Sequence, residues 1–212
     1  MAEFRDRREA GRQLAEELSA YGDREDVVVL GLPRGGVPVA FEVAKALEAP
    51  LDVFVVRKLG VPGNPELAMG AIASGGVRVL NDGVVRRMSI PDEEIEQTAE
   101  EEREKLEKRE EIYRGARPGI ALTGKTVLLV DDGLATGATM RAAVSALREH
   151  DPEEIVVAVP TAPPETCSEF EDIVDDIICV STPRAFFGVG GAYQDFSQTT
   201  NEDVRDLLEQ AG

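Results

Sequence analysis

The stretch GIALTGKTVLLVDDGLATGATM, residues 119–140, decides the fold because it holds two phosphate-binding patterns side by side. Its first half, residues 119–126, has the G-x-x-x-x-G-K-T spacing of a nucleoside-triphosphate P-loop. A P-loop follows a strand and opens a helix, so that free amides at the helix end face the phosphates. Here the order is reversed, since RGARP precedes Gly119 and the strand-like TVLLVDD follows Lys125. We therefore interpret the first half as a turn that leads into a strand.

The second half of the stretch has the order that phosphate binding requires. The buried-strand pattern TVLLV ends at Asp131 and Asp132, and a turn of small residues leads into a helix predicted to begin near Ala138. Successive amides, the helix N-terminus and the hydroxyls of Thr136 and Thr139 would bind an anion. Two carboxylates beside an anion suit a ligand with vicinal hydroxyls next to its phosphate. The pattern thus favours a phosphorylated sugar, with a receiver-like acidic pair or a plain helix cap as the alternatives.

Strand-like and helical patterns alternate on both sides of this stretch. Short apolar runs typical of buried parallel strands lie at 27–32, 51–56, 125–130, 153–161 and 177–180. Helical periodicity occurs at 4–20, 37–49, 138–150, 163–173 and 201–210. The alternation predicts an α/β fold with a mostly parallel five-stranded sheet flanked by helices. In such sheets, ligands bind outside the carboxyl ends of the strands.

The alternation breaks down between residues 57 and 124. Residues 57–81 are rich in Gly and are predicted to form a loop plus a short hairpin. Residues 91–115 read as one long charged helix, either solvated or a strut in a dimer. We expect 61–115 to be an insertion within a single domain that spans 1–212.

The composition limits the partners and the compartment. Asp and Glu number 41 against 23 Lys and Arg, so the net charge of −18 disfavours binding to nucleic acid or to anionic membranes. No apolar run reaches the ~20 residues of a membrane span. The charged start MAEFRDRREAGRQ is unlike a signal peptide, so we expect a cytoplasmic protein. The two cysteines, Cys167 and Cys179, are predicted to be reduced core residues rather than a disulfide.

The acidic residues are spread along the whole chain instead of gathered in a tail. This distribution suggests an acidic proteome in a cytoplasm with high salt, where screening removes most of the self-repulsion. An ordinary acidic cytosolic protein is the alternative.

Four segments together resemble the type I phosphoribosyltransferases. VLLVDDGLATGATM (127–140) resembles the signature with which that family binds phosphoribosyl pyrophosphate (PRPP). GLPRGGVPVA (31–40) resembles its pyrophosphate loop, and VRKLGVPG (56–63) the opening of its mobile catalytic loop. FFGVGGAYQDFSQ (186–198) is similar to the C-terminal hood of purine salvage enzymes, which we place at about 181–198. The arrangement is most similar to predicted phosphoribosyltransferases whose acceptor is unassigned.

The resemblance implies a reaction and a set of roles. A nitrogen nucleophile would displace pyrophosphate from C1 of PRPP, with Mg²⁺ bridging pyrophosphate and ribose oxygens largely through water. Asp131 and Asp132 would hold the ribose hydroxyls and favour positive charge at C1, while Arg57 and Lys58 would neutralise the leaving group. The predicted substrate-binding residues are Arg34, Gly35, Gly36, Gly133, Ala135, Thr136, Gly137, Ala138, Thr139 and Phe187. No residue is assigned as a metal ligand.

The acceptor stays open. The segment before the hood, IICVSTPRAFF (177–187), lacks the Lys with which hypoxanthine-guanine enzymes read a purine. Adenine, another purine, a pyrimidine or an unrelated amine all remain compatible. Phe187 or Phe186 would stack on a base, or both would pack in the core, and Asp195 would hold a metal or cap a turn.

Two functions fit these residues. The first is a homodimeric enzyme of nucleotide salvage that acts on PRPP and a small nitrogenous acceptor such as a nucleobase. The alternative is a non-catalytic PRPP-sensing regulator on the same fold. The Arg57–Lys58 pair favours the enzyme, since a sensor has no leaving group to neutralise.

Overall fold

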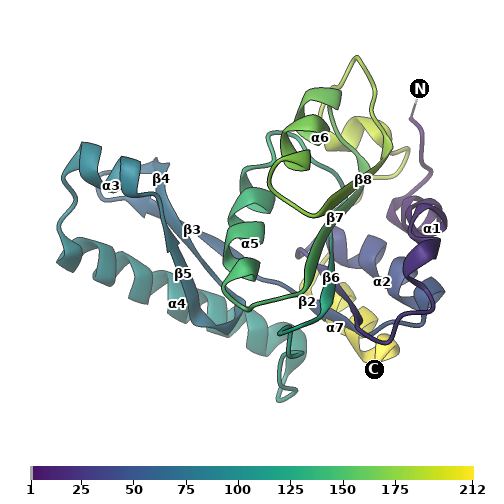
Figure 1. Ribbon diagram of the computed structural model, residues 1–212, viewed down its shortest axis with the longest axis horizontal. Helices are drawn as coiled ribbons and strands as arrows, with labels where there is room; N and C mark the ends of the chain where they lie inside the picture. The colour runs from purple at the N-terminus through teal and green to yellow at the C-terminus, as the bar shows by residue number, and fades with distance from the viewer. Residues whose placement is uncertain (1) are drawn as a thin grey trace.

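A five-stranded parallel sheet forms the centre of the computed structural model, which describes residues 2–212 (Figure 1). Its strands, in the spatial order β2-β1-β6-β7-β8, are β1 (Val27–Gly31), β2 (Leu51–Val53), β6 (Thr126–Val130), β7 (Glu154–Thr161) and β8 (Asp176–Ser181). The central pair, β1 and β6, runs in register from Val27 opposite Thr126 to Gly31 opposite Val130. The predicted fold class is therefore confirmed, and the carboxyl ends of all five strands share one edge.

Helices cover both faces of this sheet. α1 (Arg7–Glu17) and α2 (Gly36–Leu47) lie on one face, and α5 (Ala138–Arg148) and α6 (Pro164–Glu171) on the other (Figure 1). Successive strand residues point to opposite faces, so Leu128 packs among the residues of α1 and α2 while Leu129 packs against α5. Burial on both faces explains why β6 reads as an uninterrupted apolar run.

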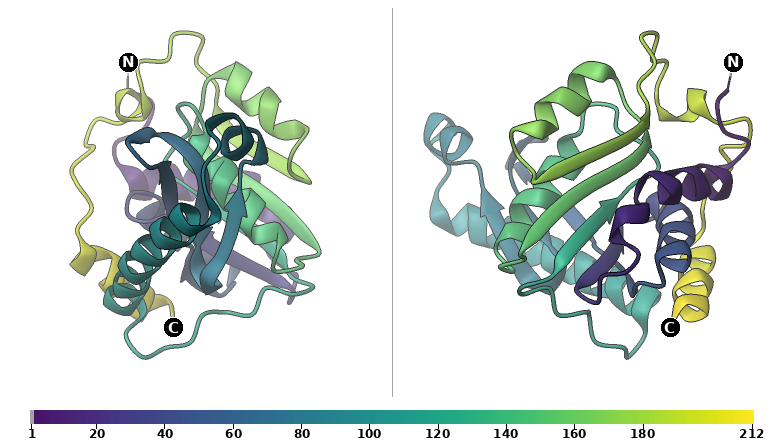
Figure 2. Two further views of the ribbon diagram at one scale, coloured as in Figure 1. Left: turned by 90° about the vertical axis from the view of Figure 1, so that its left-hand side faces the viewer. Right: turned by 45° about the vertical axis from the view of Figure 1, so that its right-hand side comes forward.

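A second, antiparallel sheet projects to one side of the first. It consists of β3 (Val56–Val61), β4 (Asn64–Ala73) and β5 (Val77–Leu80), joined by α3 (Asp82–Met88) to the long helix α4 (Asp92–Arg114), as Figure 2 shows. The prediction of a loop plus a short hairpin thus underestimated the regular structure of this region, which forms a three-stranded sheet. The predicted strand at 51–56 is also divided, because β2 ends at Val53 and β3 begins at Val56.

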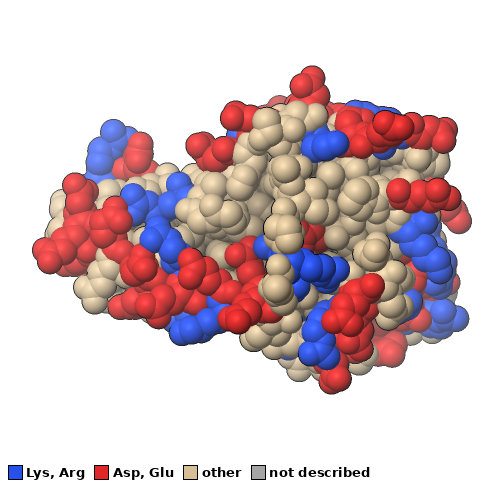
Figure 3. All heavy atoms as spheres, turned by 90° about the horizontal axis from the view of Figure 1, so that it is seen from below, with Lys and Arg blue, Asp and Glu red and all other residues tan. Residues whose placement is uncertain are grey.

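Helix α4 is only partly solvated. Its buried stripe of Ile95, Ala99, Leu106 and Tyr113 packs against side chains of β3, β4 and the last helix, α7 (Asn201–Ala211). Its other faces carry exposed glutamates, and Figure 3 shows acidic side chains running along this helix and recurring over the face seen from below. Within the described residues, no helix combines the length and the apolar character that crossing a membrane requires.

The N-terminal segment is joined to the hood. The N–H of Phe4 donates to Ala192 O at 2.9 Å, and the N–H of Gln194 donates to Phe4 O at 2.9 Å. The right-hand view of Figure 2 shows these two segments side by side at the carboxyl edge of the sheet. The pairing fixes where α1 begins, and hence where its first side chain, Arg7, lies. Short 3-10 helices also lie at Ser19–Tyr21, Ser74–Gly76 and Val189–Ala192.

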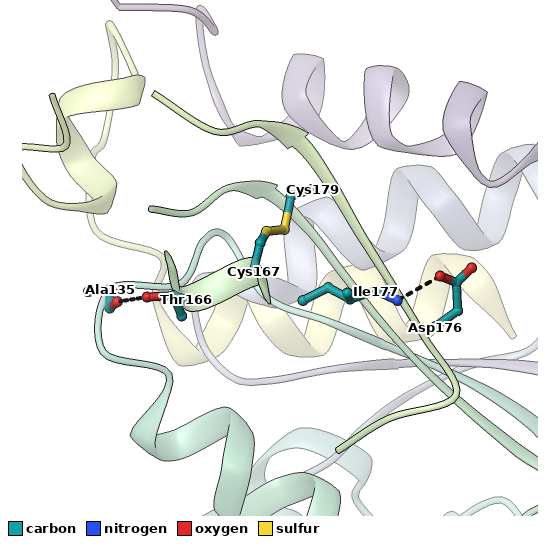
Figure 4. Close-up of a disulfide and its surroundings, with 6 residues drawn as sticks. All are labelled: Ala135, Thr166, Cys167, Asp176, Ile177 and Cys179. Carbon is teal, nitrogen blue, oxygen red and sulfur yellow. Dashed lines mark hydrogen bonds between the residues drawn. A yellow bond between two sulfur atoms is a disulfide. The ribbon is translucent and has the colours of Figure 1, made fainter. Parts of the chain in front are cut away.

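The prediction of two reduced cysteines is wrong, because the structure joins Cys167 and Cys179 in a disulfide (Figure 4). Cys167 lies on α6 and Cys179 on β8, and the chain reverses between them so that the helix packs on the strand. The adjacent Thr166 hydroxyl donates to Ala135 O at 3.0 Å, so the bridge lies one residue from a contact with the loop before α5 (Figure 4).

Candidate functional site

Two adjacent carboxylates lie where β6 ends. Asp131 and Asp132 follow the fully buried β6, and the N–H of Asp132 donates to Asp131 Oδ1 at 2.8 Å. Burial raises the pKa of Asp131 well above its ordinary value, and the neighbouring charge of Asp132 raises it further. Burial also raises the pKa of Asp132, although its ion pair with Arg7 opposes that rise. Both carboxyl groups thus lie in a poorly hydrated place, and perturbed pKa values of this kind are typical of a functional site.

The loop that follows this pair leads into α5 and is partly exposed. Gly137 adopts the left-handed φ of 70° just before α5, and its missing Cβ leaves room for the Phe170 ring. Leu134 fastens the loop to β7 by donating to Thr161 O at 2.9 Å. The remaining loop positions, Ala135, Thr136, Ala138 and Thr139, are exposed around the start of α5. A helix N-terminus with exposed small and hydroxyl-bearing residues suits a phosphate.

A second loop meets the carboxylates from the end of β1. A Cβ on Gly36 would lie 2.7 Å from Val130 O and 2.8 Å from Asp131 Cα, so the two loops touch through their backbones. A Cβ on Gly35 would collide with the Asp132 carboxylate. Arg34 is half-buried on the same loop. Burial raises the pKa of Tyr113 on α4, and the positive charge of Arg34 acts to lower it. The structure thus brings together Gly35, Gly36, Asp131 and Asp132, four of the residues that the sequence analysis assigns to the site.

Arg57 and Lys58 lie apart from this cluster, on β3 of the second sheet. Arg57 Nε is 2.5 Å from Glu102 Oε2 on α4, and both side chains are largely buried. Lys58 is exposed, with Nζ 3.9 Å from Glu66 Oε2. In this conformation, carboxylates of the insertion already neutralise the two cations predicted to face the leaving group.

The hood surrounds a small cavity at the same edge of the sheet. The cavity has a volume of about 250 Å³, and among the residues that line it are Thr161, Phe186, Phe187 and Gly188. Phe187 is 89 % exposed, whereas Phe186 is half-buried. Among residues 2–212, the buried Thr161 hydroxyl has no hydrogen-bond partner. An exposed ring above a cavity is compatible with stacking on a flat acceptor. Asp195 instead caps a turn by accepting from the N–H of Ser197 at 2.9 Å.

Arg7 and Tyr193, to which the motifs above assign no role, both contact Asp132. Arg7 Nε donates to Asp132 Oδ2 at 2.8 Å, and the Tyr193 hydroxyl donates to Asp132 O at 2.6 Å. Burial raises the pKa of Tyr193, and the charge of Asp132 adds to that rise, so its hydroxyl stays a donor. No local signal distinguishes Arg7 from the other arginines of the N-terminal helix, because its partner is 125 residues away.

No ready-made metal centre accompanies these residues. In the part of the chain that the structure describes, no three His, Cys, Asp or Glu side chains come together as they would around a metal ion. A bound Mg²⁺ would then need ligands from a substrate and from water, as that ion commonly takes them.

Comparison with known sequences identifies the family. Residues 3–194 match the sequence pattern of the phosphoribosyl transferase domain. The chain belongs to the phosphoribosyl transferase family. The carboxylate pair, the loop before α5 and the Gly35–Gly36 loop all lie within the matched residues, whereas the whole of α7 lies beyond them.

Relatives in two bacteria extend this comparison. Proteins from two strains of Mycobacterium tuberculosis, provisionally named as phosphoribosyl transferases, are each 50 % identical over 208 residues. The match covers 98 % of this chain but 47 % of theirs, so the chain spans about half the length of the curated relatives it matches. The crystal structure of TT1426 from Thermus thermophilus is 47 % identical, covers 99 % of both chains and superposes with a TM-score of 0.87.

Proposed function

We propose that this chain is a phosphoribosyltransferase that moves the 5-phosphoribosyl group of PRPP to a nitrogenous acceptor, with a nucleobase as the first candidate. The observation that carries the proposal is the partly buried carboxylate pair placed between two backbone loops, one opening α5 and the other opening α2. One ligand that needs a diol acceptor flanked by two phosphate cradles is PRPP, because its ribose separates a 5′-phosphate from a pyrophosphate.

In the proposed reaction, the bond between C1 of the ribose and the pyrophosphate oxygen breaks, and the pyrophosphate leaves with the electron pair. The acceptor nitrogen forms the new bond to C1 from the opposite face and then loses its proton. Positive charge develops on the ribose ring in between, as in glycoside hydrolysis. The charges of Asp131 and Asp132 stabilise that state in a poorly hydrated site, where electrostatic effects are strong.

Other residues orient the two ends of PRPP in this proposal. The amides of 135–139 and the hydroxyls of Thr136 and Thr139 hold the 5′-phosphate, and the loop of Arg34, Gly35 and Gly36 holds the pyrophosphate. Phe187 stacks on the acceptor above the hood cavity. A bound Mg²⁺, which the family implies, would neutralise part of the phosphate charge of PRPP. We also keep the predictions of a homodimer and of a single domain over 1–212.

The second candidate is a PRPP-binding regulator without catalysis. One observation favours it: Arg57 is held by Glu102 at 2.5 Å instead of facing the carboxylate pair. An enzyme would need this pair to open when the leaving group departs, and a regulator would not.

One experiment separates the two functions. Pyrophosphate release from magnesium-PRPP is measured against adenine, hypoxanthine, guanine, uracil and a simple amine, while PRPP affinity is measured by titration calorimetry. Release with any acceptor establishes the enzyme. PRPP binding without release from the whole panel favours the regulator, and absence of PRPP binding refutes both. The variant that combines Asp131→Asn and Asp132→Asn serves as the control, since it keeps the shape of the site and removes the charges.

A further inference from the structure

Arg7 joins three parts of the fold at one point. It is the first residue of α1, where Asp6 caps the helix by accepting from the N–H of Glu9 at 2.8 Å. Its Nε donates to Asp132 Oδ2 at 2.8 Å, and its Nη1 donates to Ser197 O at 2.7 Å. One guanidinium thus connects the N-terminal helix, the carboxylate pair and the end of the hood.

The surroundings of Arg7 hold it in this geometry. Its guanidinium carbon lies 3.9 Å from the centroid of the Phe196 ring, which stacks on Tyr193 with centroids 5.1 Å apart. The Arg7 and Asp132 side chains are 11 % and 14 % exposed, so the ion pair is largely removed from water. Stacking and a forked donor set restrict an arginine far more than an exposed ion pair does.

The same contacts leave part of Asp132 free for a ligand. Arg7 engages Oδ2, whereas Oδ1 accepts no hydrogen bond within residues 2–212. The main chain of Asp132 is fixed separately, because the Tyr193 hydroxyl donates to its carbonyl oxygen at 2.6 Å. With one carboxylate oxygen and the carbonyl both held, the side chain has a fixed orientation, and its remaining oxygen is free to accept a hydrogen bond from a ribose hydroxyl.

We propose that Arg7 is a positioning residue that orients Asp132 for the PRPP diol and couples this orientation to the seating of the hood. The proposal rests on the proposed function, since it assigns a diol to Asp132. It also gives the N-terminal helix a part in the site, which motifs confined to residues 31–198 do not suggest. Displacing the hood withdraws Phe196 and Ser197 from Arg7 and releases Asp132.

The test uses the full chain and magnesium-PRPP as the probe. Arg7→Met keeps the bulk of the side chain and removes its donors, and Arg7→Lys restores the charge without the fork. Arg12→Met is the matched control, because Arg12 lies on the same helix, is half-exposed and pairs with Glu42, which Arg8 also engages. Losing a charged hydrogen bond at a buried carboxylate weakens PRPP binding by about 10-fold to 100-fold in Arg7→Met. We expect a smaller loss in Arg7→Lys and no change in Arg12→Met.

A second readout reports on the hood. The chain has no tryptophan, so Phe196→Trp introduces a single tryptophan, whose emission can be excited selectively, at the ring position next to Arg7. Addition of magnesium-PRPP changes its emission in the otherwise unaltered chain but not in the variant that also carries Arg7→Met. Should Arg7→Met merely lower the unfolding midpoint while its folded fraction binds PRPP as tightly as the wild type, Arg7 is only structural and the proposal fails.

Three outcomes of the binding measurement are decisive. Tighter PRPP binding by Arg7→Met would show that Arg7 obstructs the diol site instead of orienting it, and would overturn the proposal. If the wild type itself binds no PRPP, the proposed function fails, and the role of Arg7 fails with it. Wild-type binding with an unaffected Arg7→Met refutes the positioning role alone.

Discussion

Replacing Gly36 by alanine tests the contact between the two loops of the site. The new Cβ would lie 2.7 Å from Val130 O, about 0.7 Å short of the 3.4 Å at which ordinary contact begins, and 2.8 Å from Asp131 Cα. Val130 O and Asp131 Cα are both backbone atoms, so no change of side-chain rotamer relieves the clash. One of the two loops must therefore move by most of the missing 0.7 Å. Crowding of this kind costs about 1–3 kcal/mol of unfolding free energy.

The effect on binding follows from the same displacement. Functional groups need to be held within about 0.5 Å of their productive positions, and a displacement near 1 Å costs on the order of 100-fold. We therefore expect Gly36→Ala to lower PRPP affinity, and pyrophosphate release where it occurs, by about 10-fold to 100-fold. Titration calorimetry and a urea unfolding curve measure the two effects separately.

Alanine substitutions at two other glycines serve as comparisons for Gly36→Ala. Gly119→Ala is the control, since its nearest neighbour is an Arg114 guanidinium atom at 3.6 Å and the added methyl group fits. Gly35→Ala would displace the Asp132 side chain, not its backbone, so we expect weaker PRPP binding with a smaller loss of stability. Wild-type affinity in Gly36→Ala, together with the expected loss of stability, would refute the idea that this loop holds the pyrophosphate.

Three further predictions concern charge and covalent structure. Asp131→Asn should raise the unfolding free energy at neutral pH by on the order of 1 kcal/mol, because the pKa of Asp131 is raised in the folded state and its charge there costs stability. This gain in stability should shrink as the pH falls toward the ordinary carboxyl pKa. A gain that grows on acidification would contradict the prediction. Reducing the Cys167–Cys179 bridge, which spans a sequence separation of 12, should lower the unfolding free energy by about 3 kcal/mol; two free thiols found by mass spectrometry without reductant would remove the basis for this. With a net charge of −18, stability should rise between about 0.1 M and 1 M KCl as the screening length falls from about 10 Å to 3 Å, and a flat salt profile would argue against adaptation to high salt.

The parallel sheet could be predicted because its strands are buried on both faces. β1, β6 and β7 read as continuous apolar runs, and their observed ends lie within a residue or so of the predicted ones. The second sheet could not be predicted in full. β4 (NPELAMGAIA) is exposed along its first half and carries small residues, so it shows neither an apolar run nor a clear alternation.

The candidate site shows the same division. The placement of Asp131, Asp132, Gly35 and Gly36 at one edge of the sheet could be predicted from local patterns. Each of these residues lies shortly after a recognisable strand, and ligands bind outside the carboxyl ends of such strands. The pairing of Arg57 with Glu102 and of Arg7 with Asp132 depends on helices packed from distant parts of the chain. The disulfide likewise depends on how α6 returns to β8, which the spacing of two cysteines does not encode.

A crystal structure of the complex with magnesium-PRPP tests the central claim most directly. We predict the 5′-phosphate within hydrogen-bond distance of the amides at 135–139, the ribose diol on the free oxygens of Asp131 and Asp132, and the pyrophosphate against Gly35 and Gly36. PRPP bound elsewhere, with the start of α5 and both carboxylates left free, would contradict the account.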